Sequence, residues 1–403
     1  MRIFLAVVRS LGRSGKEVHA VPFTADSPAL TSKYISTVHH VPRYSDDPAA
    51  WLSAVLKLLR EHRFDLVIPC CDDRSILPFD KHRADFSSTK IAIPSPTAIN
   101  LLFDKDRTRQ LSIDLGIPVT TGIVLSAGDT AKDLAARFGL PLILKPRNSY
   151  ALDRLDKFGK VWIVDSLSML ESLLANISEP SRFLVEKLFE GSGVGVSVLA
   201  DQGQILTAFQ HRRLREGRGG SSSYRISEPL DSDLMQACQK ICSHTKLTGV
   251  CMFEFRYNLK SKDWILLETN ARFWGSLPLP LSLGVNFPVY LYDLLVRGIR
   301  PEQRPYLRGI RARNLVLDGF NLVSELRYLH GGEIGSWIAA WGDYLTQPFR
   351  WLTRRERSDS FVADDLKPAL WECAMLFTGA FGKITRRKDA GASRVQQRRE
   401  QAA

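Results

Sequence analysis

The chain has 403 residues, of which 44% are hydrophobic and 24% are charged. This composition excludes a mainly disordered or fibrous protein and fits two or three globular domains. No apolar run reaches the roughly 18 residues of a spanning helix, and the first residues lack the pattern of a signal peptide. The six cysteines are neither dense enough for a disulfide scaffold nor spaced for a zinc site, so we expect reduced thiols in a cytoplasmic protein.

The net charge is +12, from 55 Lys and Arg against 43 Asp and Glu. A good part of the excess lies in the polar segment 383–403, which carries seven basic and two acidic residues. We therefore predict a disordered basic tail there. The remaining chain is only mildly basic, which argues against a specific nucleic-acid partner.

Residues 1–94 alternate between strand and helix patterns, which is typical of a doubly wound parallel sheet. The apolar spacing of Arg2–Gly12 predicts a helix at the start of the chain. Such a domain normally begins with a strand, so we expect this sheet to lack its first strand. The other expected elements are strands at 17–23, 37–42, 65–69 and 91–94 and a helix at 48–62.

Residues 95–298 mix helices with strands and are expected to form an α+β domain. A helix is predicted at 96–116, and strands 250–257 and 264–270 flank a turn and are predicted to form a β-hairpin. The fold class is therefore α/β and α+β. Further expected strands are 119–125, 140–145, 161–164, 183–186, 195–200 and 205–213, and further expected helices are 130–138, 167–177 and 232–247.

Residues 299–382 contain tryptophans interleaved with arginines and are predicted to form a small helical appendix. Its apolar residues are Trp337, Ile338, Trp341, Leu345, Phe349, Trp351 and Leu352. One interpretation is a helical cap on the body of the protein. The alternative is peripheral contact with the inner face of an anionic membrane, aided by the basic tail.

The hairpin carries the most informative polar residues. Because strand side chains alternate, Glu254 lies on one face of its strand, and Glu268, Asn270 and Arg272 share one face of the next strand. If the turn sets the register, these groups converge on one surface. Two carboxylates and a carboxamide are hard oxygen ligands that suit Mg²⁺, and the arginine suits an anion beside the metal. A solvated amphipathic hairpin is the alternative.

The stretch FEF followed by ETNAR resembles the metal-binding strands of the ATP-grasp superfamily, and the resemblance extends over about residues 1–298. By this resemblance, Glu254, Glu268 and Asn270 would hold Mg²⁺ against the phosphates of ATP. Arg272 would contact the transferred phosphoryl group or the acyl phosphate.

The resemblance also implies nucleotide contacts. Lys105, with Arg109 one turn later as an alternative, would be the first nucleotide lysine. Lys145 ends a buried apolar strand and needs a partner, because burying an unpaired ammonium costs several kcal/mol; a phosphate would satisfy it. Glu186 would accept from the adenine amino group. The main chain of Lys187 and Leu188 would complete the adenine contacts.

A basic strand and a glycine-rich loop follow at 211–223. Arg213 and Arg215 are expected to share a face, separate from that of Arg212, and the resemblance implies that this strand points at phosphates and the substrate carboxylate. The main chain of Gly219, Gly220 and Ser221 is expected to present N–H groups to an anion. A solvated basic loop is the alternative. His211 is expected to be structural rather than a general base.

These features predict an ATP- and Mg²⁺-dependent ligase that activates a small-molecule carboxylate as an acyl phosphate for attack by an amine. The catalytic residues would be Arg272 and Arg213. The missing first strand and the sparse cover loop favour the alternative of an ATP-binding regulatory module with lost or incomplete activity, whereas the intact set Glu254, Glu268, Asn270, Arg272 and Lys145 argues against it. The loop 147–160 holds one glycine where a glycine-rich cover loop is usual, and Gly193 and Val194 stand where a ribose-binding carboxylate is usual.

Overall fold

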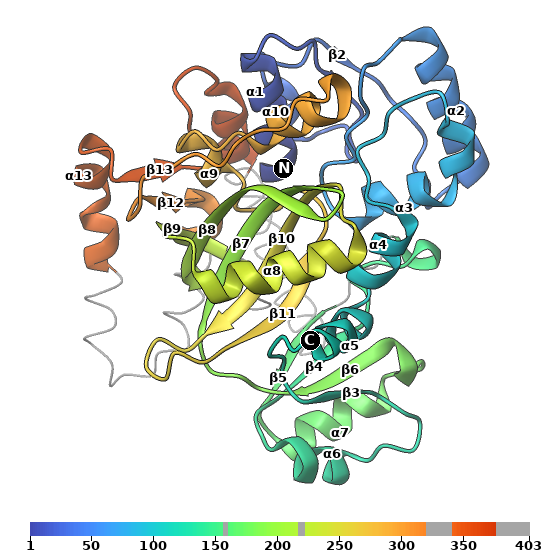
Figure 1. The fold of residues 1–403 in the computed structure, drawn as a ribbon, viewed down its shortest axis with the longest axis vertical. Coiled ribbons are helices and arrows are strands. Elements are labelled where there is room, and N and C mark those ends of the chain that lie inside the picture. Colours follow the sequence, from blue (N-terminus) through green and yellow to red (C-terminus); the bar gives the residue numbers. More distant parts are fainter. Residues whose placement is uncertain (156–159, 217–221, 320–340, 376–403) are drawn as a thin grey trace, which may run out of the picture.

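The computed structural model describes residues 1–155, 160–216, 222–319 and 341–375, and its main feature is a pair of β-sheets. The larger sheet has seven strands in the order β11-β10-β7-β8-β9-β12-β13, and the smaller has four in the order β3-β6-β4-β5. In Figure 1 the larger sheet lies at the centre and the four-stranded sheet lies below it. The predicted mixture of helices and sheets is confirmed.

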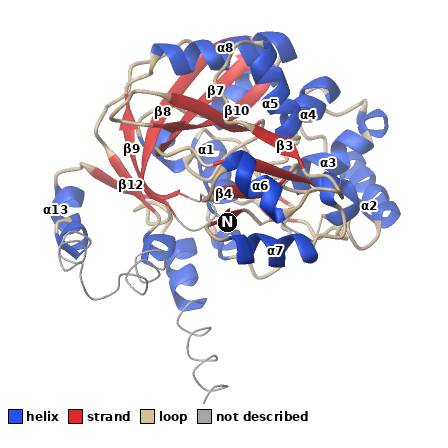
Figure 2. Ribbon diagram, turned by 90° about the horizontal axis from the view of Figure 1, so that it is seen from below, coloured by secondary structure: helices blue, strands red, loops and turns tan. Residues whose placement is uncertain are grey.

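The larger sheet is antiparallel apart from the parallel pairing of its last two strands. Its strands are β7 (Ser192–Asp201), β8 (Gln204–Glu216), β9 (Ser222–Glu228), β10 (Gly249–Tyr257), β11 (Trp264–Asn270), β12 (Arg311–Arg313) and β13 (Glu356–Ser358). The strands from β7 to β11 were expected from the sequence, except for β9, which follows the glycine-rich loop. Helix α8 (Ser232–Thr245) lies along one side of the sheet and α1 (Arg2–Arg13) along the other (Figure 2).

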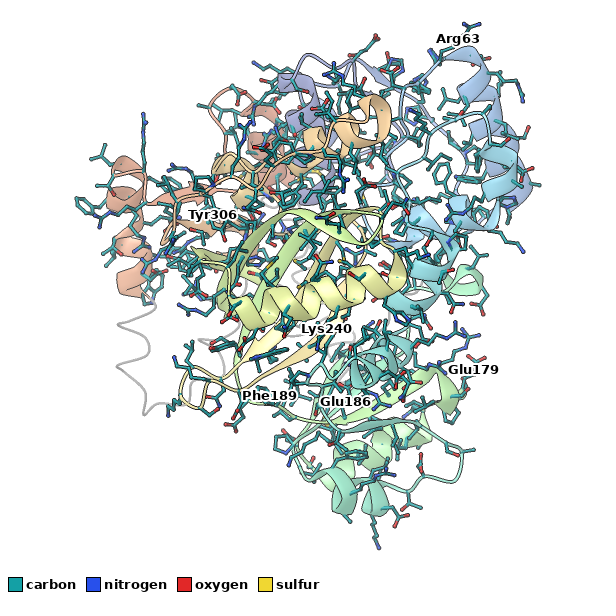
Figure 3. The ribbon with its side chains drawn as sticks, viewed as in Figure 1. Arg63, Glu179, Glu186, Phe189, Lys240 and Tyr306 are labelled. Carbon is teal, nitrogen blue, oxygen red and sulfur yellow. The ribbon has the colours of Figure 1, made fainter. Side chains whose placement is uncertain are left out.

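The four-stranded sheet is antiparallel and is covered by two helices that pack against each other. It contains β3 (Gly122–Val124), β4 (Leu142–Pro146), β5 (Trp162–Val164) and β6 (Phe183–Lys187), with helices α6 (Ala131–Phe138) and α7 (Leu167–Ala175). The segment from β6 to β7 connects the two sheets, and its residues Glu186 and Phe189 are labelled in Figure 3.

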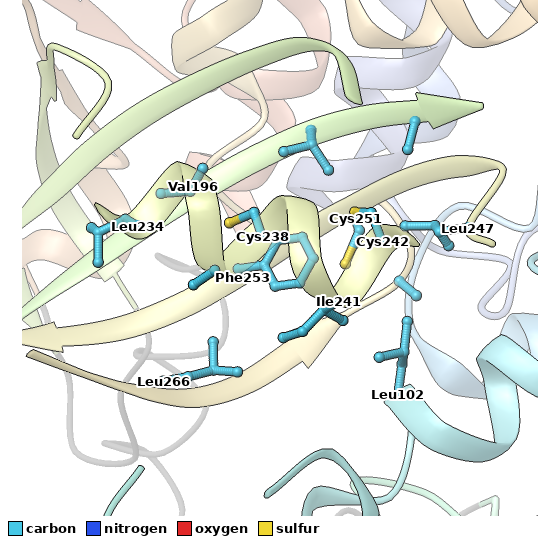
Figure 4. Close-up of a cluster of buried hydrophobic side chains, with 14 of the residues drawn as sticks. Leu102, Val196, Leu234, Cys238, Ile241, Cys242, Leu247, Cys251, Phe253 and Leu266 are labelled. Atoms are coloured by element: carbon cyan, nitrogen blue, oxygen red, sulfur yellow. The ribbon is translucent and has the colours of Figure 1, made fainter. Parts of the chain in front are cut away.

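Side chains alternate along the strands of the large sheet, and this alternation determines which residues face each of its two sides. Cys251, Phe253 and Phe255 of β10 point to the α8 side, where they form a core with Cys238 and Ile241 of the helix (Figure 4). On the other side, Met252 packs in a second core that includes Ala6, Val7 and Leu11 of α1. Because Glu254 follows the alternation of Met252, it lies on the α1 side of the sheet.

The N-terminal region begins with the predicted helix, α1, which buries Leu5, Val7, Val8 and Leu11. The strands that follow are parallel as predicted but much shorter, with two residues each in β1 (His19–Ala20) and β2 (Thr37–Val38). The expected strands at 65–69 and 91–94 form a single parallel bridge between Val67 and Ile91. The helices of this region are α2 (Pro48–Glu61) and α3 (Asp73–Lys81).

The single helix expected at 96–116 is wrong, because the structure has α4 (Pro96–Leu102) and α5 (Lys105–Asp114). Asp104 causes the break. Its carboxylate accepts from the backbone N–H groups of Asp106, at 2.9 Å, and Arg107, at 3.2 Å, and so caps a new helix. Lys105 therefore lies at the first position of α5 rather than inside a long helix.

The C-terminal region is not the purely helical appendix that the sequence predicts, because β12 and β13 extend the large sheet. Short helices α9 (Pro278–Ser282), α10 (Phe287–Tyr292) and α13 (Gln347–Leu352) accompany them. Trp341, Leu345, Phe349, Trp351 and Leu352 are exposed. Trp337, Ile338 and the tail 383–403 lie outside the described residues, and within the described part no helix is long and apolar enough to cross a membrane.

Candidate active site

Strands β10 and β11 form the predicted hairpin. Glu254 is directly opposite Glu268, and Met252 is opposite Asn270. On the turn side Phe255 is opposite Leu266, and a β-bulge between Glu254 and Phe255 shifts the register by one residue. The turn itself is closed by the Asn258 N–H, which donates to the Asp263 carbonyl at 2.8 Å, while the Asn258 side chain accepts from the Lys260 N–H at 2.9 Å. Two carboxylates therefore meet on adjacent strands.

The two carboxylates differ in their partners. Glu254 accepts from the guanidinium of Arg213 and, at 3.2 Å, from the side-chain amide of Asn270. Among the described residues Glu268 accepts no hydrogen bond, and its nearest cation is the Lys105 ammonium at 3.6 Å. The Glu268 side chain is 30% exposed, whereas the Glu254 side chain is 14% exposed. Glu268 thus has free oxygen lone pairs that are open to a ligand.

Their pKa values move in opposite directions. Burial raises the pKa of Glu254, and the facing Glu268 adds to this, although Arg213 opposes both. Burial would also raise the pKa of Glu268, but Lys105, Lys145 and Arg272 outweigh it and hold that pKa below its usual range. The charge of Glu268 therefore adds to the cost of ionising Glu254, and a further cation at the pair would reduce that cost.

Arg272 connects this hairpin to the N-terminal region. Its guanidinium donates to the Asn270 side-chain carbonyl at 2.7 Å and to Asp73 at 2.8 Å. Asp73 is buried in the first turn of α3 and was not predicted as a site residue. The available signal was its position just after the expected strand 65–69, where polar residues often line a site in parallel sheets.

The buried lysine that ends β4 has the partner that its burial requires. The Lys145 ammonium lies 2.7 Å from a Glu186 carboxylate oxygen, and the two side chains are 8% and 5% exposed. Glu186 is on the adjacent strand β6, and Gly122 of β3 leaves room for it, because a Cβ on Gly122 would lie 2.6 Å from its Cγ. The family resemblance implies that both residues contact the nucleotide, but nothing in the sequence indicates that they pair with each other.

The two main-chain positions predicted after Glu186 differ in availability. The N–H of Lys187 donates to the Thr121 carbonyl at 2.9 Å, and its carbonyl accepts from the Thr120 hydroxyl at 2.7 Å. Within the described residues, the main chain of Leu188 takes part in no hydrogen bond. Leu188 is therefore the residue of this pair whose polar groups are open to a ligand.

The first predicted nucleotide lysine, Lys105, lies between the two sheets. Its ammonium donates to the Ser149 hydroxyl at 3.0 Å and faces Glu268. The alternative, Arg109, is paired with Asp106 at 3.1 Å and lines a narrow cavity that also borders Glu186. The structure thus places Lys105 with the carboxylate pair and Arg109 nearer to Glu186.

The arginines of β8 do not act as one group. The register of β8 against β9 shifts between Arg213 and Arg215, which separates two side chains that the sequence places on one face. Arg213 reaches Glu254, whereas Arg215 lies 2.6 Å from Asp318 at the far end of the sheet. Arg212 pairs with Glu228 at 2.6 Å, so of the three only Arg213 joins the carboxylate pair.

The same segment also contains the glycine-rich loop and His211. Gly219, Gly220 and Ser221 lie outside the described residues. His211 is buried, and burial, followed by Arg225 and Arg213, holds its pKa well below the usual range. A neutral buried imidazole agrees with the structural role expected for it.

A larger cavity lies beside the hairpin. It has a volume of about 520 Å³ and is lined by residues 91–95 of the N-terminal region, by the start of β10 and by Arg272. Arg83, which also lines it, pairs with Asp80 at 2.7 Å. The cavity is therefore lined by two arginines, of which Arg272 also contacts Asn270 of the hairpin.

The donor set fits Mg²⁺. Glu254 and Glu268 supply carboxylate oxygens from paired positions, Glu268 has unused lone pairs, and such oxygens are the ligands that Mg²⁺ prefers. Asn270 fits less directly, because its side-chain oxygen already accepts from Arg272. Asn270 would have to exchange that hydrogen bond for the metal.

Comparisons with known proteins agree on one kind of fold. A family model described as "ATP-grasp in the biosynthetic pathway with Ter operon" matches residues 179–316. A D-alanine–D-alanine ligase of Xanthomonas axonopodis pv. citri (strain 306) is 32% identical over 104 residues, which are 25% of this chain and 31% of the ligase. The chain spans only 18% and 31% of the first two curated relatives that it matches.

Solved structures extend the similarity over most of the chain. The biotin carboxylase of Campylobacter jejuni, solved with an ATP analogue, superposes with a TM-score of 0.59 at 20% identity and covers 77% of this chain and 72% of that one. An L-amino acid ligase of Bacillus licheniformis gives a TM-score of 0.54 at 19% identity and covers 73% and 72%. At these identities the similarity shows a common fold.

Proposed function

Because this chain is an ATP-grasp protein by its fold and by the family model that it matches, we propose that it is an ATP- and Mg²⁺-dependent ligase joining a carboxylate to an amine. The observation that carries this proposal is the meeting of Glu254 and Glu268 from one sheet with Lys105 and Lys145 between the two sheets. Carboxylates and lysines in this arrangement are better suited to binding a nucleoside triphosphate and its metal ion than to stabilising the fold.

The residues divide into two groups. Lys145, Glu186 and the main chain of Leu188 lie together on the four-stranded sheet and its connection, and they would bind the base and the inner phosphates. Glu254, Glu268 and Asn270 would hold Mg²⁺ at the outer phosphates. When bound, Mg²⁺ neutralises phosphate charge and helps to align the transferred group.

The arginines would act on the reacting groups. Arg213 and Arg272 border the carboxylate pair from opposite sides, through Glu254 and Asn270 respectively. A substrate carboxylate oxygen would attack the γ-phosphorus, and ADP would leave. The amine would then attack the acyl carbon and expel phosphate. Guanidinium groups fixed beforehand stabilise the charge that develops in both steps, without a covalent nucleophile from the protein.

The cavity of about 520 Å³ is the proposed place for the carboxylate substrate, because Arg272 and Arg83 line it. Arg272 is held by Asp73 of the N-terminal region, so that region would position the residue that meets the substrate. The D-alanine–D-alanine ligase and L-amino acid ligase among the similar proteins support amino acids as the first substrates to test.

Hydroxylamine trapping tests the reaction. The full-length protein is incubated with Mg²⁺, ATP, pools of amino and other carboxylic acids, and hydroxylamine as the nucleophile. We expect hydroxamate and ADP to form in equal amounts, and only when Mg²⁺ and a reactive carboxylate are both present. ADP without hydroxamate would contradict the ligase chemistry.

Nucleotide binding distinguishes the regulatory alternative. The sparse glycine content of the loop 147–160 keeps this second candidate open, since it leaves the cover of the phosphates unusual. A protein that binds Mg-ATP, measured by calorimetry, but forms no ADP with any pool would be a nucleotide-binding module. The cavity next to Arg272 would then serve another purpose.

A further inference from the structure

Three histidines meet in the N-terminal region, far in sequence from the ATP-grasp residues. His19 is in β1, His39 directly follows β2, and His62 directly follows α2. Their ring centroids lie 5.0 to 5.1 Å from one another, and one nitrogen from each ring lies within 4.8 Å of the others. The fold thus brings three imidazoles together from three separate elements.

We propose that His19, His39 and His62 form a binding site for a divalent transition-metal ion, with Zn²⁺ as the first candidate. Zinc–nitrogen bonds of about 2.0–2.1 Å in a tetrahedral arrangement place ligand nitrogens about 3.4 Å apart. The His19 Nδ1 and His39 Nε2 atoms are 2.8 Å apart, and the third ligand lies within 4.8 Å. Small rotations of the three side chains therefore suffice to surround one ion.

A carboxylate orients one of the rings. The Glu17 carboxylate lies 3.1 Å from His19 Nε2, which leaves Nδ1 directed at the cluster. A carboxylate on the far nitrogen of a ligating histidine is the usual outer partner in zinc sites, because it fixes the ring and the tautomer. Glu17 would therefore be a positioning residue and not a ligand.

An aromatic ring borders the three imidazoles. Phe64 packs against His19 and His62 with centroid distances of 5.1 and 5.5 Å, so the cluster has one apolar wall.

Three nitrogen ligands leave one tetrahedral position open. Imidazole nitrogens suit Zn²⁺, Ni²⁺ and Cu²⁺ and select against Mg²⁺, which prefers oxygen. Strands β1 and β2 pair through only two residues each. A metal ion bound by the three histidines would link these two strands to each other and to α2. The site would therefore stabilise the N-terminal region, which in turn supplies Asp73 to Arg272.

Competition against a chromophoric chelator tests the site. The full-length protein, freed of metal by chelation and dialysis, is titrated with Zn²⁺, and separately with Co²⁺ to record the absorption of a four-coordinate ion. We expect one equivalent to bind to the parent and to His40→Ala. His40 is the matched control, because it is next in sequence but exposed and outside the cluster.

His39→Ala and His62→Gln should each weaken Zn²⁺ binding by at least about 100-fold, in line with the loss of a ligand. Glu17→Gln should weaken it less and should alter the Co²⁺ spectrum. Glu268→Gln should leave the affinity unchanged, which separates this site from the carboxylate pair. Unchanged affinity in His39→Ala and His62→Gln, or no bound equivalent in the parent, would overturn the proposal. Circular dichroism checks that the variants are folded.

Discussion

The two ends of the seven-stranded sheet both carry buried charges, but they use them differently. At one end β10 and β11 hold the carboxylates Glu254 and Glu268, and at the other end β12 and β13 lie in a network of arginines and acids. At the far end each acid is surrounded by donors. In the hairpin, Glu268 accepts no hydrogen bond from any described residue.

At the far end, the buried acids have several hydrogen-bond donors each. Asp318, which is fully buried, accepts from Arg215 at 2.6 Å, Ser223 at 2.7 Å, Arg313 at 2.9 Å and Tyr344 at 2.6 Å. Arg313 is also fully buried and additionally pairs with Glu356 at 3.1 Å. This network holds the C-terminal strands on the sheet. Its charges have partners enough to repay the cost of burial.

At the hairpin end, one carboxylate lacks hydrogen-bond donors among the described residues. Glu254 and Glu268 face each other, and their mutual repulsion raises the pKa of Glu254 in addition to burial. The charge of Glu268 is balanced by nearby cations, chiefly Lys105, and by no hydrogen-bond donor among the described residues. The contrast indicates that the far end serves stability and that the hairpin is built for a ligand that supplies positive charge.

The largest effect should come from breaking the saturated network. Asp318→Asn removes a charge that two arginines share and should lower the free energy of unfolding by about 3–5 kcal/mol, because it leaves buried cations uncompensated. Urea unfolding followed by circular dichroism measures it. The same chemical change in the hairpin, Glu268→Gln, should cost less than about 1 kcal/mol, since that side chain is part-exposed and faces a like charge. Equal costs at the two ends would remove the contrast.

The next effect concerns Lys145, which combines both kinds of role. Lys145→Ala should lower stability by about 3 kcal/mol, because Glu186 stays buried without its partner, and should also weaken nucleotide binding. The double variant Lys145→Met, Glu186→Gln removes both charges and should regain most of the stability but not the binding. If the double variant bound Mg-ATP like the parent, the pair would belong with the stabilising network instead.

The smallest effect is a pH dependence from His211, which lies in the sheet between the two ends. Its pKa is held well below the usual range in the folded state, so the unfolded chain takes up a proton near pH 6.5 that the folded chain does not. His211 should leave the free energy of unfolding unchanged above about pH 6.5. It should lower that free energy by about 2 kcal/mol between pH 7 and pH 5. His211→Gln should flatten this part of the profile, whereas the exposed His40→Gln should retain the full slope of the parent.

The hairpin could be predicted because its information is local. Alternation indicates which side chains share a face, but the β-bulge between Glu254 and Phe255, which brings Glu254 opposite Glu268 instead of Leu267, does not follow from the turn. The break between α4 and α5 could also have been predicted, because aspartate is a common helix N-cap residue and Asp104 caps α5. The residues of the site were assigned from the family pattern on these local elements.

The partners of those residues could not be predicted, because they depend on long-range contacts. Asp73 and Arg272 are 199 residues apart, and nothing in either segment indicates the other. The irregular register at Arg213 and Arg215 sends two neighbouring arginines to opposite ends of the sheet. Strands of three residues, such as β12 and β13, carry too little pattern to be distinguished from loops.

The Mg²⁺ dependence of nucleotide turnover in Glu268→Gln tests the central claim most directly. ADP release is measured for the parent, for Glu268→Gln and for Glu302→Gln, an exposed glutamate that serves as the matched control. We expect Glu302→Gln to equal the parent and Glu268→Gln to stay folded but to lose at least about 100-fold in Mg²⁺-dependent turnover, the scale of losing one electrostatic contact at a reacting centre. Turnover in Glu268→Gln equal to that of the parent would contradict the assignment of the carboxylate pair to the metal.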